Sequence, residues 1–261
     1  MIYTDDNTEQ FDIELNRLCR ADPYGTRIIA LRSSYSGKKY NFLDFWIQRD
    51  ENNGAYAAFC LYSGTMIICG EPYDVTEVRE FVQMISPAKI QCRSVAELLP
   101  QNIGMQKKSG EIMVFVGTDV YDNGMYKVEQ VSSDMSALRK IYDLLVKVFN
   151  IKNIDFESFF LSMSHGIRHY TSEIYAILNE YNEPVSTAFV TYKTDYAMII
   201  SCVATKKKYR KRGMAEAVLR VILQKYGTGD KKIYLQREDP IKLYDSLGFV
   251  KCGEWAEYSK G

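Results

Sequence analysis

The sequence predicts an α+β protein whose chain divides into two parts near residues 118–126. Apolar residues switch repeatedly between the period of two that is typical of strands and the period of three to four that is typical of helices. Residues 118–124 are polar and rich in turn formers, which indicates a boundary between a domain over 1–120 and a domain over 126–261. The third observation is a basic turn, residues 206–212, that joins an apolar strand to an amphipathic helix.

The first part mixes helices and strands. Its patterns predict helices over 11–19, 75–85 and 95–99, and strands over 40–47, 55–62, 65–69, 89–92 and 112–116. The second part begins with a strand over 126–131 and a helix over 135–149, for which Asp134 or Ser133 is the expected N-cap. A helix over 156–163, a hairpin of strands 174–178 and 185–192 that turns at 182–184, and a strand over 198–203 follow.

The basic turn leads into a helix from Met214, because apolar residues recur from there at helical spacing until Gly227 and Gly229 end it. Gly213 has no Cβ, so the backbone can approach a ligand closely there. The first N–H groups of a helix are unpaired and carry the positive end of its dipole. Strand, cationic turn and helix start together predict a site for a phosphate-bearing ligand.

A strand over 232–235 and a short helix complete the second part before a last strand over 250–252. Asp239 is the expected N-cap of that helix, Pro240 its first residue and Gly248 its stop. The helix contains Leu243-Tyr244, and Gly248-Phe249 follows it.

Both segments resemble motifs of the GNAT superfamily of N-acetyltransferases. The acyl-CoA-binding motif of that family reads Arg or Gln, two residues, Gly, one residue, Gly or Ala, and Arg210, Gly213 and Ala215 fit it in register. The Leu-Tyr, three residues, Gly-Phe segment is similar to a family element that follows the fifth strand. The chain departs from many relatives in having Arg237 and Pro240 where they have Asn and Ala. Arg237 would then contact the cofactor's phosphates or face water.

The resemblance covers 126–261 and implies two GNAT-like lobes, each a mixed, mostly antiparallel central sheet flanked by helices. The second lobe would be the acetyltransferase domain. In the first, the corresponding corner over 69–74 has no basic residue and no matching glycine spacing. We therefore expect 1–120 to be a degenerate GNAT-like lobe that does not bind the cofactor, or a general accessory domain.

The resemblance also implies the roles of individual residues. Acetyl-CoA is the expected cosubstrate, and no metal is expected. The backbone of Val203 would polarise the thioester carbonyl, and the amides of 211–215 would hold the diphosphate. The expected cofactor-binding residues are Val203, Thr205, Arg210, Lys211, Arg212, Gly213, Met214 and Ala215.

Tyr244 is the expected catalytic residue. An alkylamine has a pKa of about 10.4, so deprotonation at pH 7 costs about 4–5 kcal/mol and some base must accept the proton. A phenol has a pKa of about 10 and a thiol of about 8.5, so full proton transfer from Tyr244 to the thiolate runs uphill by about 2 kcal/mol. We therefore expect Tyr244 to act mostly as a hydrogen-bond donor to the leaving sulfur. The other interpretation of Tyr244 is a packed aromatic residue.

Residues 150–170 are expected to shape the acceptor site. Two histidines four residues apart can share a helix face there, but a metal site needs more ligands. His169 is open to two interpretations, a base or a structural residue. The aromatic, histidine and water-ordering candidates are Phe156, Phe159, Phe160, His165, His169, Glu180, Gln236 and Glu238.

Composition narrows the class of protein. Lys plus Arg number 33 and Asp plus Glu 33, which argues against a dedicated nucleic-acid binder, although basic runs are also typical of nuclear-targeting signals, nucleic-acid patches and solvated loops. No apolar run approaches a membrane span, and residues 1–6 lack a signal-peptide pattern. The six cysteines show no CxxC spacing, which indicates a reducing cytoplasm and no metal site. We expect a cytoplasmic monomer or homodimer that binds neither nucleic acid nor membrane.

These patterns predict an enzyme that moves an acetyl group from acetyl-CoA to a primary amine of a small molecule or peptide by direct attack on the thioester. Two alternatives stay open at this point. One is a non-catalytic acyl-CoA sensor, and the other is a nucleic-acid-associated protein that uses the basic run.

Overall fold

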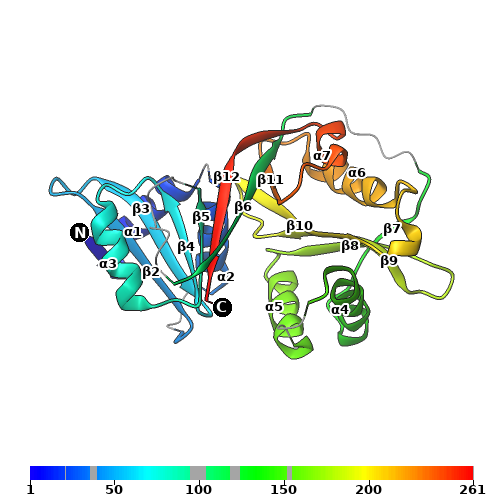
Figure 1. The fold of residues 1–261 in the computed structure, drawn as a ribbon, viewed down its shortest axis with the longest axis horizontal. Helices are drawn as coiled ribbons and strands as arrows, with labels where there is room; N and C mark the ends of the chain where they lie inside the picture. Colours follow the sequence, from blue (N-terminus) through cyan, green and yellow to red (C-terminus); the bar gives the residue numbers. More distant parts are fainter. Residues whose placement is uncertain (21, 36–39, 95–103, 118–123, 152–154, 261) are drawn as a thin grey trace. The chain divides into compact units, whose positions relative to one another are not determined.

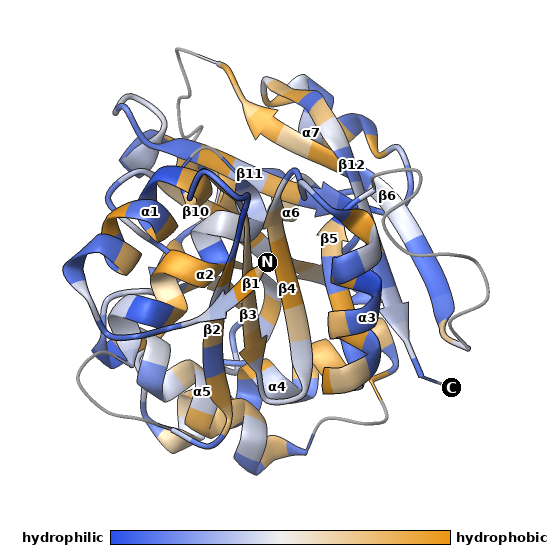
Figure 2. Ribbon diagram, turned by 90° about the vertical axis from the view of Figure 1, so that its left-hand side faces the viewer, coloured by the Kyte–Doolittle hydropathy of each residue, from blue (hydrophilic) through white to orange (hydrophobic). Residues whose placement is uncertain are grey.

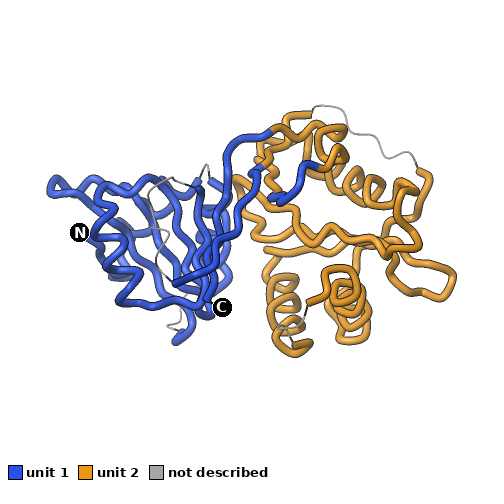
Figure 3. The backbone as a smooth tube through the Cα atoms, in the orientation of Figure 1, with its two compact units in different colours: residues 1–112, 236–240, 251–261 blue, residues 113–235, 241–250 orange. Residues whose placement is uncertain are grey.

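The computed structural model describes all residues except 21, 36–39, 95–103, 118–123, 152–154 and 261, and it forms two compact units (Figure 3). Unit 1 comprises residues 1–112, 236–240 and 251–261, and unit 2 comprises 113–235 and 241–250. The C-terminal segments 236–240 and 251–261 thus belong with the N-terminal residues. The domain division at 118–126 remains a prediction, since most of that segment lies outside the described residues.

Unit 1 is a mostly antiparallel sheet with three helices in its described residues. Strands β1 to β4 pair antiparallel in chain order, β4 pairs parallel with β5, and residues of the last strand, β12 (Phe249–Ser259), pair antiparallel with β5. The elements are β1 (Ile2–Thr4), α1 (Glu9–Cys19), α2 (Pro23–Ser34), β2 (Leu43–Arg49), β3 (Ala55–Tyr62), β4 (Thr65–Gly70), α3 (Val75–Ile85), β5 (Lys89–Arg93) and most of β6 (Gln106–Phe115) (Figure 1).

The sequence predicted most elements of this unit, although the predicted strand over 112–116 overlaps only the end of β6 and the one over 250–252 only the start of β12. Strand β3 and helix α3 have the predicted bounds, but helix α2 and strand β1 were not predicted. Helix α2 is buried on most sides, so it has no single apolar face that periodicity would detect. A Cβ at Gly25 would lie 2.2 Å from the carbonyl oxygen of Cys19, which shows how closely α1 and α2 approach. The predicted helix over 95–99 lies outside the described residues.

Unit 2 repeats the same succession of elements. Strands β7 to β10 pair antiparallel in chain order, β10 pairs parallel with β11, and a helix, α6, links that parallel pair as α3 links β4 and β5. The elements are β7 (Val128–Gln130), α4 (Met135–Phe149), α5 (Phe156–Arg168), β8 (Glu173–Leu178), β9 (Pro184–Thr191), β10 (Ala197–Thr205), a 3₁₀ turn (Lys207–Tyr209), α6 (Met214–Tyr226), most of β11 (Lys232–Arg237) and α7 (Lys242–Ser246).

The sheet of unit 2 separates two apolar clusters. Helices α4 and α5 cover one face of β8 to β10, and α6 covers the other (Figure 1). Ribbons coloured by hydropathy show the helices striped and β4 and β10 largely apolar (Figure 2). The helices are striped because each buries one apolar face against the sheet. The central strands are apolar throughout because helices cover both of their faces.

Three predicted helix boundaries of unit 2 have clear outcomes. Asp134 caps α4 by accepting the N–H of Ala137 at 2.9 Å, as predicted. Helix α5 runs to Arg168, beyond the predicted end at 163. The predicted cap of α7 is wrong, because the helix begins at Lys242 after Ile241, with no side-chain cap. A cap contributes only about 1 kcal/mol, so the path of the chain outweighs it at Asp239.

Candidate active site

Strand β10 breaks its pairing just before the basic turn. Its antiparallel register with β9 shifts between Ser201 and Ala204, and its parallel register with β11 ends at Ile200. Within the shift, Cys202 has a φ of 50°, which residues other than glycine seldom adopt. A bulge of this kind leaves backbone groups out of the ladder and redirects them. Val203 lies within this irregular stretch of β10, between the paired residues Ser201 and Ala204.

The turn after β10 forms an open corner at the start of α6. Gly213 is the N-cap with a φ of 76°, and no side chain of the described residues caps the helix. A Cβ at Gly213 would meet no described atom within 4 Å, so no neighbouring group fills the position beside this N-cap. The residues present therefore fit an anionic group bound by backbone N–H groups.

Hydrogen bonds hold this corner in shape. Arg210 Nε donates to the carbonyl oxygen of Thr205 at 3.1 Å, and the Lys206 N–H donates to Val185 at 2.9 Å. The hydroxyls of Thr205 and Ser186 lie 2.8 Å apart. Sequence patterns missed the contribution of Tyr126, whose hydroxyl donates to the carbonyl oxygen of Arg212 at 2.7 Å from a position 86 residues away.

The corner is strongly cationic. The side chains of Lys207, Lys208, Arg210, Lys211 and Arg212 are exposed. The Lys208 ammonium lies 5.0 Å and the Arg212 guanidinium 5.7 Å from the centre of the Tyr209 ring. A hydrogen bond with Asn179 and the neighbouring Lys208 lower the pKa of Tyr209. Such a group of charges attracts a polyanion.

Tyr244 belongs to the same apolar cluster as the corner. Its side chain is 9% exposed, and its ring lies edge-on to Phe249 with 6.2 Å between centroids. Val203 and Met214 pack against this cluster from β10 and from the first turn of α6. The fold thus brings Tyr244 into one cluster with Val203 and Met214, which lie 41 and 30 positions before it in the chain.

Other sequence candidates are engaged elsewhere. Arg237 neither faces water nor remains available for phosphate, because its side chain is 9% exposed and pairs with Glu111 at 2.8 Å. The Gln236 side chain accepts from Arg27 at 2.6 Å and donates to Tyr24 at 2.7 Å. Glu180 and Glu238 are exposed.

His165 and His169 stack on each other at the C-terminal end of α5, with ring centroids 4.2 Å apart. Burial, together with the neighbouring His169 and Arg168, lowers the pKa of His165. The described residues contain no group of three or more His, Cys, Asp or Glu side chains that could hold a metal ion.

The corresponding corner of unit 1 is filled by its own side chains. Asp74 caps α3 by accepting the N–H groups of Thr76 at 2.8 Å and Glu77 at 3.1 Å. The fully buried Gln48 accepts the N–H of Tyr73 at 2.9 Å and donates to the carbonyl oxygen of Asp74 at 2.9 Å. An acidic, capped helix start repels an anion where α6 attracts one.

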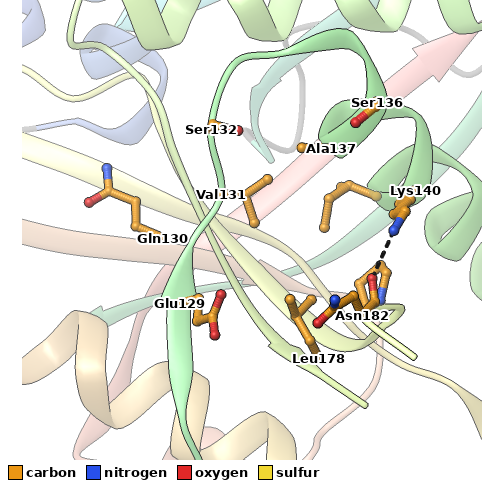
Figure 4. A pocket seen from close by; sticks show the side chains of 11 residues that line it. Glu129, Gln130, Val131, Ser132, Ser136, Ala137, Lys140, Leu178 and Asn182 are labelled. Carbon is orange, nitrogen blue, oxygen red and sulfur yellow. Dashed lines mark hydrogen bonds between the residues drawn. The ribbon is translucent and has the colours of Figure 1, made fainter. Parts of the chain in front are cut away.

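A separate cavity of about 240 Å³ lies between β7, the start of α4 and the β8–β9 turn (Figure 4). Glu129 and Gln130 line it from β7 and Lys140 from α4, whose Nζ donates to the carbonyl oxygen of Asn182 at 3.0 Å. None of the predicted cofactor residues lines this cavity. It is also smaller than most ligand pockets, which measure roughly 300–1,000 Å³.

Comparison with solved structures shows that the whole chain has the fold of GNAT N-acetyltransferases. A GCN5-related N-acetyltransferase from Sphaerobacter thermophilus is similar with a TM-score of 0.65 at 14% identity, over 98% of this chain and 94% of that chain. A putative GNAT-family acetyltransferase from Novosphingobium aromaticivorans gives 0.58 at 14% identity, over 90% and 95%. A tandem GNAT protein from the clavulanic acid biosynthesis pathway gives 0.59 at 11% identity, over 100% and 98%.

No family model and no curated protein matches the sequence. The predicted fold class, two GNAT-like lobes that each have a mixed, mostly antiparallel sheet flanked by helices, is confirmed by these structures. At such low identity these similarities show the fold alone, and the activity has to be argued from the residues of the site. No helix in the described part of the chain has the length and apolarity that crossing a membrane requires.

Proposed function

We propose that this protein is an acetyl-CoA-dependent N-acetyltransferase whose residues 126–261 carry the active site. The observation that carries the proposal is the uncapped, open start of α6 at Gly213, which adjoins the broken pairing of β10 and the cluster that contains Tyr244. In this proposal the helix start binds the diphosphate, the redirected backbone of β10 polarises the thioester carbonyl, and the nearly buried phenol stabilises the leaving thiolate.

The N–H groups of 211–215 hold the diphosphate of the cosubstrate in this proposal, with the exposed Arg210, Lys211 and Arg212 around it. Thr205, Met214 and Ala215 form the walls of the same corner. Hydrogen bonds to charged groups contribute roughly 1.5–3 kcal/mol each, so a few of them suffice for micromolar affinity. Bound acetyl-CoA supplies an activated acetyl thioester beside the backbone of Val203, which polarises the carbonyl.

The acceptor is a primary amine of a small molecule or peptide. It enters as an ammonium ion and loses one proton to a base or an ordered water. The neutral nitrogen attacks the carbonyl carbon, so that a C–N bond forms and the C–S bond then breaks. Tyr244 donates a hydrogen bond to the departing sulfur. The products are an N-acetyl amine and the CoA thiol, with one proton released to solvent.

Calorimetry with acetyl-CoA and thiol release with a panel of amines test this function together. We expect micromolar binding and amine-dependent release of CoA. The double variant Lys211→Gln with Arg212→Gln should weaken binding at least tenfold, because it removes two charges beside the diphosphate. Lys232→Gln, at an exposed lysine of β11 outside the corner, is the matched control and should bind normally. Absence of acetyl-CoA binding by the unaltered protein would refute the proposal.

A further inference from the structure

We infer that the cavity between β7, the start of α4 and the β8–β9 turn binds a short linear amino acid, and that this ligand strengthens the binding of acetyl-CoA. The regulatory part of this inference rests on the proposed function, whereas the binding of the amino acid does not. The cavity of about 240 Å³ belongs entirely to unit 2. Pockets for drug-sized molecules measure roughly 300–1,000 Å³, so this one suits a smaller metabolite.

Apolar side chains form the middle of the cavity lining. Ile141 from α4 is 1% exposed, and Pro184 at the start of β9 is also buried. The partly buried apolar residues that line the same cavity are Val131, Ala137 and Leu178. Burial of a methylene chain against this surface is favourable, whereas a polar group placed there would lose its water without a partner.

Two opposite charges flank the apolar lining. Glu129 contributes a carboxylate from β7, and Lys140 contributes an ammonium group from α4. The side chains of Val131 and Leu178 lie between these two groups (Figure 4). The matching ligand has an ammonium group at one end, a carboxylate at the other and an aliphatic chain between them. This is the chemistry of an ω-amino acid.

The present partners of these charges leave them able to bind a ligand. Glu129 pairs with Lys127 at 2.7 Å, but an ion pair with so exposed a lysine is weak and readily exchanged. The Lys140 ammonium has three N–H donors, of which one donates to the carbonyl oxygen of Asn182 at 3.0 Å. The Glu183 carboxylate lies 3.6 Å from the same ammonium, but it is half-exposed and does not line the cavity.

The β8–β9 turn connects this cavity to the cationic corner. Asn182 of the turn lines the cavity, and its N–H donates to the carbonyl oxygen of Asn179 at 3.0 Å. The Oδ1 atom of Asn179 accepts the N–H of Glu183 at 3.0 Å, which closes the turn. Asn179 also forms a hydrogen bond with Tyr209 of the basic turn. The same few residues therefore border the cavity and support the corner.

The start of β9 makes a second connection. Pro184 lines the cavity, and the next residue, Val185, accepts the N–H of Lys206 at 2.9 Å. The hydroxyl of Ser186 lies 2.8 Å from that of Thr205. A ligand that fixes the turn thus restricts the corner in advance, so the corner loses less conformational entropy when acetyl-CoA binds. By reciprocity, acetyl-CoA strengthens the binding of the amino acid by the same factor.

Calorimetry on the full chain with 5-aminopentanoate tests the cavity, and we expect a Kd below about 1 mM. Its isomer L-norvaline carries both charges at one end, and pentanoate lacks the ammonium group, so both should bind at least tenfold more weakly. Lys140→Gln and Glu129→Gln should each weaken the binding of 5-aminopentanoate about tenfold. Ala137→Leu should abolish it, because the larger side chain fills the cavity. Lys147→Gln, at an exposed lysine of α4 outside the cavity, is the matched control.

The regulatory part is measured as the Kd of acetyl-CoA with and without saturating 5-aminopentanoate. We expect the ligand to lower this Kd about fivefold in the unaltered protein and to have no effect in Ala137→Leu. An unchanged Kd in the unaltered protein would overturn the regulatory part.

The outcomes distinguish this inference from the proposed function. If 5-aminopentanoate does not bind, or binds Ala137→Leu as well as the unaltered protein, the cavity is not its site and the acetyltransferase remains. Equal binding of L-norvaline overturns the linear class of ligand. If acetyl-CoA does not bind, the proposed function fails, and the cavity variants still decide whether the amino acid binds there.

Discussion

Tyr244 is a nearly buried phenol in a helix of only five residues, and the fold places its ring in one apolar cluster with residues of the corner. It belongs to the cluster against which Val203 and Met214 pack. Tyr175 belongs to the same cluster, and Tyr126, Tyr209 and Tyr226 pack against it, so the cluster places Tyr244 near the corner and its sequence motif singles it out from the other tyrosines. A hydroxyl near a leaving thiolate acts only in the transition state and not in the binding of acetyl-CoA.

Replacement of Tyr244 by Phe should therefore lower kcat about tenfold to thousandfold and leave the Kd of acetyl-CoA nearly unchanged. Steady-state thiol release gives kcat, and calorimetry gives Kd. Tyr181→Phe, at a side chain in unit 2 that is 75% exposed and outside residues 150–170, serves as the matched control. Full turnover in Tyr244→Phe would remove this residue from the mechanism.

Glu173 shows a different use of a buried polar side chain. Tyr226 and Tyr175 donate to its carboxylate at 2.5 Å, Lys225 lies 2.9 Å away, and Lys193 also pairs with it. Burial alone would raise the pKa of Glu173, but these hydrogen bonds outweigh it and lower the pKa from 4.5 to about 2. The cluster joins the end of α6 to β8, at the opposite end of α6 from Gly213.

Glu173→Gln should reduce the free energy of unfolding at pH 7 by about 2–3 kcal/mol. The folded-state pKa lies below the unfolded one, so the ionised carboxylate stabilises the fold above about pH 4.5 and this contribution disappears as the pH falls towards 2. Urea unfolding of both proteins between pH 7 and pH 3 measures the difference, with the exposed Glu157→Gln as control. A difference that stays constant over this range would contradict the assignment.

At the scale of elements, helices α3 and α6 occupy equivalent places in the two units but begin differently. Helix α3 follows Asp74, which accepts two of its first N–H groups. Helix α6 follows Gly213, which offers no side chain and has a φ of 76°. The same element order thus yields a helix start capped by a side chain in one case and an uncapped one in the other, and the N-cap residue makes the difference.

Gly213→Ala should lower acetyl-CoA affinity at least tenfold, because its Cβ would occupy the unfilled position beside the N-cap, where the proposed diphosphate approaches the backbone. The positive φ adds a backbone strain of about 1 kcal/mol. Gly64→Ala is a matched control for that strain, since Gly64 has a φ of 78° in unit 1, with its nearest described contact at 3.8 Å. Calorimetry should show weaker binding in the first variant alone, whereas thermal unfolding should show similar losses in both. Equal affinities in the two variants would count against the corner.

At the scale of the whole molecule, the chain contains one element order twice. Each unit runs strand, two helices, three strands, helix and strand, with its parallel strand pair on either side of the linking helix. The repeats have diverged at the corner. In unit 1 the register of β3 with β4 continues without a shift to Gly70, whereas β10 carries a bulge. A Cβ at Gly70 would also lie 2.4 Å from the carbonyl oxygen of Tyr56, so no open space adjoins it.

Each chain should consequently bind one molecule of acetyl-CoA. Calorimetry on the full-length protein measures this directly, and a stoichiometry near one is the expected result. The capped start of α3 and the carboxylates of Asp74 and Glu77 there disfavour a second diphosphate. A stoichiometry near two would show that unit 1 also binds the cosubstrate, and would contradict the idea of a degenerate lobe.

Much of this architecture could be predicted from local patterns. The bounds of β3, α3 and α4 follow from apolar periodicity and caps, and the corner at Arg210, Gly213 and Ala215 follows from a short motif. Helix α2 was not predicted, because a helix that is buried on most sides lacks the apolar periodicity of a surface helix. The predicted cap at Asp239 was wrong because a capping preference of about 1 kcal/mol is too weak to set the path of the chain against tertiary packing.

Short-range signals therefore predicted most of the strands and helices and the cationic corner, because those depend on residues a few positions apart. The bulge at Cys202 contains no glycine or proline from which it could be predicted. It is seen only in the register of β10 against β9. Three hydrogen bonds join residues that are 26 to 126 positions apart: Tyr126 to Arg212, Gln48 to Asp74 and Arg237 to Glu111. Such contacts depend on how sheets and helices pack, so only the folded chain reveals which corner is open and which is closed.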